Sequence, residues 1–89
     1  MIDAVSDAEI LRAQEAIVRL AGIFVEPACA APIAGLRNAI ASGAIDGSSR
    51  IVAVMTGFGL KDPDSASRLI GEIRTAPATL AGVRAALGW

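Results

Sequence analysis

One hydroxyl and one amine lie close together in the segment IVAVMTGFGLKDPD, residues 51–64. Thr56 ends an apolar run, and Gly57 and Gly59 follow it with an aromatic residue between them. In an open α/β sheet, a polar group at the carboxyl end of a strand often meets a ligand. Lys61 is the only lysine of the sequence, so any Schiff-base chemistry by this chain would have to use it. The same residues would also fit an ordinary strand end followed by a turn, with no ligand bound.

Two further reactive side chains, Glu26 and Cys29, lie in FVEPACAA at residues 24–31. Glu26 either points into a cleft or lies at the start of a following helix, where its negative charge interacts favourably with the positive end of the helix dipole. Cys29 lies among alanines and is expected to be a small buried apolar residue, since the sequence has no histidine to act as its base. The lack of histidine also excludes a histidine metal site and a Ser-His-Asp triad within this chain. We therefore expect no histidine-based catalysis and no metal site here.

The composition of the chain argues against several classes of binding partner and location. Eight basic residues balance nine acidic ones, and no basic patch with interleaved aromatic residues is present, which argues against nucleic acid. No apolar run approaches the roughly 20 residues of a membrane span. The N-terminus lacks the basic and long apolar regions of a signal peptide. The single cysteine suits a reducing compartment, so we expect a cytoplasmic protein.

The apolar content is high for so short a chain, at 54% of 89 residues. A domain of this size buries only a modest part of its surface, so some apolar residues are expected to face a partner. That partner would be the remainder of a larger protein or a second copy of the chain. We treat residues 1–89 as a single partial domain.

The elements that must position these groups follow the order helix, short strand, helix, long strand, helix, helix. Ser6 and Glu9 form a capping-box pattern, and Gly22 is a natural helix stop. The long strand is apolar throughout, which favours a strand covered on both faces, as in a parallel sheet. The elements are expected at 6–21, at 23–25, from Pro27 or Pro32 to Gly43, at 50–56, from Asp62 to about Arg74, and at 78–89.

Alternating strands and helices indicate an α/β protein with layered architecture. Two strands do not make a stable parallel sheet. The sequence therefore predicts a piece of a larger three-layer αβα domain, or a chain that assembles with itself.

The motifs SDAEI, GIFVEPACAA and TGFGLKDP, taken in this order and spacing, resemble the C-terminal portion of threonine synthase. This is a pyridoxal-phosphate enzyme of the tryptophan-synthase-β fold type, also called fold type II. The resemblance covers roughly residues 5–66. It implies a parent enzyme that converts O-phospho-L-homoserine and water into L-threonine and phosphate.

The resemblance also implies cofactor-binding residues. Thr56 matches the family threonine whose hydroxyl hydrogen-bonds the pyridine nitrogen of the cofactor, and Gly57 and Gly59 would give the ring room. Glu26 and Ala28 match a junction that lines the cofactor cleft from behind.

The sequence departs from the family pattern at several points. Phe58 stands where the family has Asn or His, and Cys29 replaces a serine. The family's catalytic lysine and phosphate-binding loops lie in other segments, and Lys61 matches a different family lysine. The resemblance thus implies that this chain forms one wall of the cofactor site, carries no catalytic residue and is inactive alone. Two alternatives stay open: a segment of a serine or threonine dehydratase, and a non-catalytic assembly module.

Overall fold

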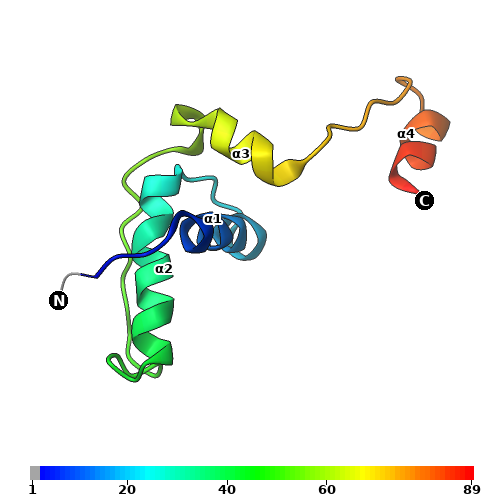
Figure 1. Ribbon diagram of the computed structural model, residues 1–89. Helices are drawn as coiled ribbons and strands as arrows, with labels where there is room; N and C mark the ends of the chain where they lie inside the picture. Colours follow the sequence, from blue (N-terminus) through cyan, green and yellow to red (C-terminus); the bar gives the residue numbers. More distant parts are fainter. Residues whose placement is uncertain (1–2) are drawn as a thin grey trace.

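The computed structural model describes residues 3–89, the side chain of Leu69 excepted, and shows an elongated helical chain (Figure 1). Its radius of gyration is 16.8 Å, against about 12 Å for a compact domain of this length. No helix within residues 3–89 has both the length and the apolar character needed to cross a membrane. The elements are α1 (Asp7–Ala21), α2 (Pro27–Ala41), the 3-10 turn η1 (Gly59–Lys61), α3 (Pro63–Ile70) and α4 (Leu80–Leu87).

Helix α1 begins and ends as its sequence predicts. The Ser6 backbone N–H donates to Glu9 Oε2 at 2.7 Å, and the Glu9 N–H donates back to Ser6 Oγ at 3.4 Å. Gly22 ends the helix in the left-handed region with φ of 68°, where a Cβ would be unfavourable. These local bonds satisfy backbone groups that the helix ends would otherwise leave open.

Glu9 also ties α1 to α2, because Asn38 Nδ2 donates to its Oε1 at 2.9 Å. The hydrogen bonds from Ser6, followed by that from Asn38, lower the pKa of Glu9 from 4.5 to about 2. The folded chain therefore holds this carboxylate ionised well below the pH at which the unfolded chain protonates it.

Stability should consequently fall as the pH drops from about 4.5 toward about 2, since a depressed folded-state pKa contributes only while the group stays ionised. Glu9→Gln keeps a capping residue but cannot titrate, so its thermal midpoint should change less across this window. Circular dichroism melts at stepped pH would test this. Equal acid sensitivity of the two chains would contradict a role for Glu9.

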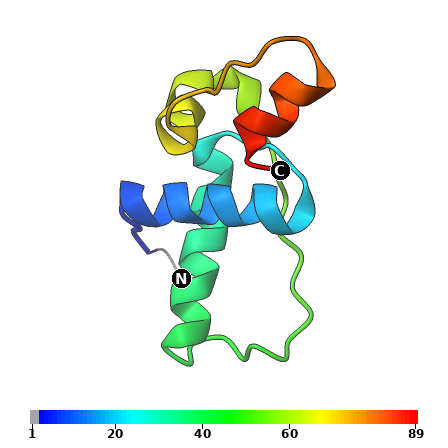
Figure 2. The same ribbon diagram turned by 90° about the vertical axis from the view of Figure 1, so that its right-hand side faces the viewer.

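Small side chains form the contact between α1 and α2, which cross each other (Figure 2). The buried cluster consists of Ala13, Val25, Cys29, Ala30 and Ala34. Alanines let the two helix backbones approach closely, and larger apolar residues pack around this contact. Those residues are Val5, Ile10, Ile17, Ile33 and Met55.

Gln14 is a buried polar residue next to this cluster, with 1% of its surface exposed. Its Nε2 donates to the Val25 carbonyl at 2.7 Å, which ties α1 to the segment before α2. Its Oε1 finds no hydrogen-bond partner among the described residues.

Gln14→Ala should destabilise the chain by about 1–3 kcal/mol, because it leaves the buried Val25 carbonyl without a donor. Gln14→Met loses the same bond and the same unpaired Oε1 as the alanine variant, but it keeps the side-chain volume and leaves no cavity, so it should cost less than the alanine. Urea unfolding followed by circular dichroism would rank the two variants. A more stable alanine variant would refute this account of Gln14.

The two predicted strands are not formed as ladders in residues 3–89. Among the residues that the structure describes, 50–56 run as an extended segment without backbone partners, and 23–25 contribute only an isolated antiparallel bridge between Val25 and Phe58. Val52 and Val54 are 86% and 71% exposed. A strand needs a neighbour for its backbone groups, and the described residues provide none. The predicted three-layer αβα arrangement is therefore not confirmed by this structure.

The last two helices follow local signals. Asp62 caps α3 by accepting the Ser65 N–H at 3.2 Å, and Pro63 takes the first helical position. The predicted end near Arg74 was wrong, because Gly71 leaves the helical region with φ of 69°. α2 begins at Pro27 and continues through Pro32, where one helical N–H is missing.

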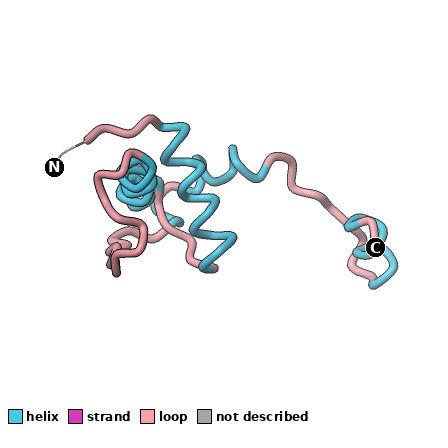
Figure 3. The backbone as a smooth tube through the Cα atoms, turned by 90° about the horizontal axis from the view of Figure 1, so that it is seen from below, coloured by secondary structure: helices cyan, strands magenta, loops and turns pink. Residues whose placement is uncertain are grey.

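Helix α4 confirms the predicted last helix, but it stands apart from the other helices. An extended link separates it from α3 (Figures 1 and 3). Arg74 Nη1 in this link donates to the Ala86 carbonyl at 2.9 Å. Leu80 and Trp89 remain exposed, so the apolar face of this helix has no cover among the described residues.

Candidate functional site

Residues 24–26 and 57–59 lie side by side and join the beginning of α2 to the turn before α3. The Gly59 N–H donates to the Phe24 carbonyl at 3.0 Å, and the Glu26 N–H donates to the Gly57 carbonyl at 3.3 Å. Together with the bridge between Val25 and Phe58, these bonds fix the register of the two segments.

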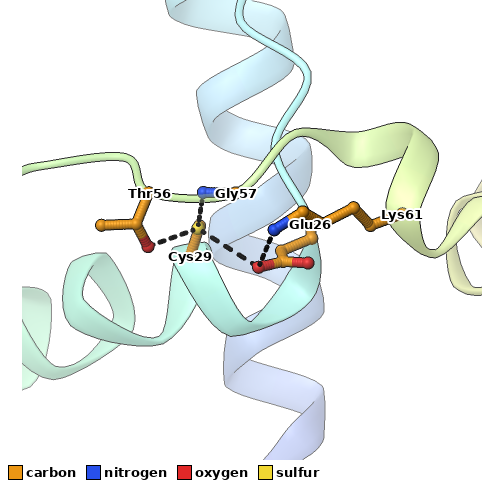
Figure 4. Close-up of polar contacts among 5 residues, drawn as sticks. All are labelled: Glu26, Cys29, Thr56, Gly57 and Lys61. Atoms are coloured by element: carbon orange, nitrogen blue, oxygen red, sulfur yellow. Dashed lines mark hydrogen bonds and ion pairs between the residues drawn. The ribbon is translucent and has the colours of Figure 1, made fainter.

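This pairing gathers a chain of polar contacts around Cys29 (Figure 4). The Gly57 N–H donates to Cys29 Sγ at 2.7 Å. Thr56 Oγ1 lies 3.3 Å from the same sulfur, and Glu26 Oε1 lies 3.8 Å from it. Lys61 Nζ is 3.9 Å from Glu26 Oε1. The contacts therefore run without a break from an exposed amine to the threonine hydroxyl.

The two glycines are buried, and the residues beside them leave no room for a side chain. A Cβ at Gly57 would overlap the Glu26 carboxylate, and one at Gly59 would lie 2.5 Å from the Phe24 ring. Glycine is therefore needed here for close approach of the two segments. The sequence suggested that these glycines give a ligand room, and the structure shows that they give room to Glu26 and Phe24.

In the structure, Phe58 packs against Phe24. Its ring meets Phe24 edge to face, with ring centroids 6.2 Å apart and an interplanar angle of 67°, a favourable aromatic geometry. The side chain is nonetheless 60% exposed. An apolar residue at this position thus extends the Phe24 contact outward.

The structure brings four of the five residues predicted for the site together. Thr56, Gly57 and Glu26 all contact Cys29 or one another, and Gly59 pairs with the Glu26 segment. Ala28 lies apart from these contacts. It is exposed and lines a groove of about 630 Å³ between α2 and residues 51–54.

Cys29 is the residue whose role the sequence did not reveal. The expectation of a buried residue was confirmed, but its sulfur meets three polar groups rather than an apolar pocket. The spacing Glu26–Cys29 offered one signal, because residues three apart on a helix share a face.

The site can offer a ligand the hydroxyl of Thr56, which is an exposed residue. Thr56 has one donor hydrogen and two acceptor lone pairs, and the contact with Cys29 uses only one of these. Lys61 is 63% exposed at its side chain and faces Glu26. The cluster contains no histidine, so an imidazole cannot act as a base in it.

The sequence is similar to a known enzyme family and to several of its curated members. The family described as pyridoxal-phosphate dependent enzyme matches residues 2–57. The threonine synthase of Methanocaldococcus jannaschii is 54% identical over 66 residues, which are 74% of this chain and 16% of that protein. The Halalkalibacterium halodurans threonine synthase is 52% identical over 78% of this chain and 20% of its own length.

The threonine synthase of Mycobacterium tuberculosis is 45% identical over 85 residues, which are 96% of this chain and 24% of that protein. The chain thus spans about a fifth of the length of these relatives. The resemblance inferred from the motifs is confirmed, and the matched region includes both Glu26 and Thr56. The chain belongs to the family of pyridoxal-phosphate dependent enzymes.

Proposed function

We propose that the chain is the C-terminal part of a threonine synthase-like enzyme and forms one wall of its cofactor site. The complete enzyme would convert O-phospho-L-homoserine and water into L-threonine and phosphate in the cytoplasm. The observation that carries this proposal is the pairing of residues 24–26 with 57–59, which presents the Thr56 hydroxyl beside Cys29. Relatives named threonine synthase support the assignment.

The residues present fit one edge of pyridoxal phosphate. Thr56 has an exposed hydroxyl with hydrogen-bonding capacity left for the pyridine nitrogen, and Gly57 and Glu26 lie beside it. Pyridoxal phosphate supplies an electron-withdrawing ring for amino-acid chemistry when it is bound. Thr56 would hold that ring by its nitrogen, and a neutral hydroxyl leaves the nitrogen largely unprotonated, where a carboxylate would favour the protonated form.

The same residues do not fit the covalent anchor of the cofactor. Lys61 is the only lysine of the sequence, and its ammonium group lies 3.9 Å from Glu26 Oε1 in an ion pair. The reactive lysine and the phosphate-binding loops would therefore come from the remainder of the enzyme. This is the reason why we expect the chain to be inactive alone.

The unpaired segment 50–56 supports an origin in a larger α/β domain. Its exposed valines and unpartnered backbone are what a central strand would show once its neighbours are removed. In the complete enzyme we expect this segment to join a parallel sheet of a three-layer αβα domain of fold type II. The partner is then the rest of the enzyme rather than a second copy of this chain.

The test compares the complete protein that carries this chain with residues 1–89 alone. Both are supplied with pyridoxal phosphate and O-phospho-L-homoserine, and phosphate and threonine are measured. The complete protein should release the two products together, and the chain alone should release neither. After borohydride treatment, the chain alone should carry no cofactor on Lys61.

Other results would overturn the proposal in distinct ways. Turnover by the chain alone, with cofactor attached to Lys61, would remove the need for an outside lysine. Formation of 2-oxo acids from serine or threonine without phosphate release would indicate a dehydratase. A complete protein that binds no cofactor and has no turnover would indicate an assembly module.

A further inference from the structure

We propose that Cys29 is a positioning residue, whose thiol orients the Thr56 hydroxyl so that its hydrogen is free for the cofactor nitrogen. This inference rests on the proposed function, because it concerns the same Thr56 contact. Cys29 itself is not expected to touch the cofactor. Its sulfur lies beside the Thr56 hydroxyl and contacts it from the first turn of α2 (Figure 4).

The hydrogen-bonding capacity of the sulfur sets the direction of the contact. A thiol has one weak donor hydrogen and a weakly accepting sulfur. The Gly57 N–H already donates to this sulfur at 2.7 Å, so one of its two weakly accepting lone pairs is engaged. The S–H is then left to donate.

Two acceptors lie within reach of the S–H. Thr56 Oγ1 is at 3.3 Å, whereas Glu26 Oε1 is at 3.8 Å and also faces the Lys61 ammonium. We assign the thiol hydrogen to the nearer oxygen. When Cys29 donates to Thr56, the hydroxyl accepts there and keeps its own hydrogen for another acceptor.

Burial makes this arrangement persistent. Cys29 is 3% exposed, so water does not readily replace its contacts. Its position is also fixed by α2, since its own backbone N–H donates to the Glu26 carbonyl at 3.0 Å. The thiol therefore holds both residues of the Thr56–Gly57 pair, which lie 27 and 28 residues away in sequence.

The experiment uses the complete enzyme that carries this chain, loaded with pyridoxal phosphate. The readouts are the absorbance and circular dichroism of the bound cofactor and its dissociation constant, none of which requires turnover. The variants are Cys29→Ala, Cys29→Val and Cys29→Ser, with Thr56→Val as the reference. Val fills a similar volume without a donor, so it decides the test if the alanine variant fails to fold.

Cys29→Ala and Cys29→Val should shift the cofactor spectrum in the same direction as Thr56→Val and weaken cofactor binding severalfold. Cys29→Ser has an O–H in place of the S–H and should restore both readouts. The double variant Cys29→Val/Thr56→Val should resemble Thr56→Val alone, because the two residues act through one hydroxyl. Ile33→Val is the matched control: it trims a side chain packed on the same cluster and should leave the spectrum unchanged.

Two negative results can be told apart. If Thr56→Val shifts the spectrum and the alanine and valine variants of Cys29 leave it as in the wild type, the positioning role is overturned and the proposed function survives. If Thr56→Val itself leaves the spectrum and the dissociation constant unchanged, the proposed cofactor contact is overturned, and the role of Cys29 with it.

Discussion

Replacing Gly59 by alanine is expected to destabilise the chain by about 1–3 kcal/mol, the usual cost of forcing extra atoms into a filled site. The new Cβ would lie 2.5 Å from three atoms of the Phe24 ring. Phe24 cannot yield freely, because its carbonyl accepts the Gly59 N–H and its ring meets Phe58. The pairing of residues 24–26 with 57–59 should therefore loosen, and the contact between Cys29 and Thr56 with it.

Gly35→Ala is the matched control for this substitution. Gly35 lies within α2, and a Cβ there would meet only Val5 Cγ1 at 3.9 Å, an ordinary contact. Alanine in a helix interior is favoured over glycine by about 0.5–1 kcal/mol, so this variant should be slightly more stable. Urea unfolding of both variants would give the comparison. A Gly59→Ala chain as stable as the wild type would mean that the two segments do not need this close approach.

Replacing Thr56 by valine in the complete enzyme is expected to weaken pyridoxal phosphate binding about tenfold. Valine keeps the branched shape but has no hydroxyl, so the pyridine nitrogen would lose the donor that we propose for it. A hydrogen bond of about 1.4 kcal/mol corresponds to that factor. Titration of the apoenzyme with cofactor, followed by absorbance, would measure it, and kcat/KM should fall at least as much.

Thr56→Ser is the control for this prediction, because it keeps the hydroxyl and loses only a methyl group. It should bind the cofactor within about twofold of the wild type, a difference below 0.5 kcal/mol. If serine and valine weaken binding equally, the shape of the side chain rather than its hydroxyl would matter. The pyridine-nitrogen contact would then have to be abandoned.

Local sequence signals predicted the helices well, because a helix end depends on residues only a few positions apart. Ser6 and Glu9 form the predicted capping box, and Asp62 with Pro63 begins α3. The boundary with the largest error, near Arg74, failed for a local reason as well. Gly71 adopts a positive φ and ends α3 before the apolar pattern does.

The strands failed for a different reason. The apolar pattern of residues 50–56 is that of a buried strand, yet a strand forms only when other strands satisfy its backbone. Within residues 3–89 the segment has no such neighbours. The pattern thus describes the surroundings this segment would have in a larger domain.

The candidate site was found in part from the motifs and in part only from the folded chain. Thr56, Gly57, Gly59 and Glu26 were named from the resemblance, and the structure brings them together. Ala28 lies apart from them on an exposed part of α2. Lys61 was matched to a family lysine other than the catalytic one, and only the structure places it in an ion pair with Glu26.

By itself the sequence determined most of the helix ends and the family, because these depend on neighbouring residues or on an ordered set of motifs. Only the tertiary structure decided that Cys29 holds Thr56 and Gly57, across 27 and 28 residues of sequence. It also decided that the two glycines make room for Glu26 and Phe24. The physical reason is that such contacts depend on the path of the whole chain, which no local pattern encodes.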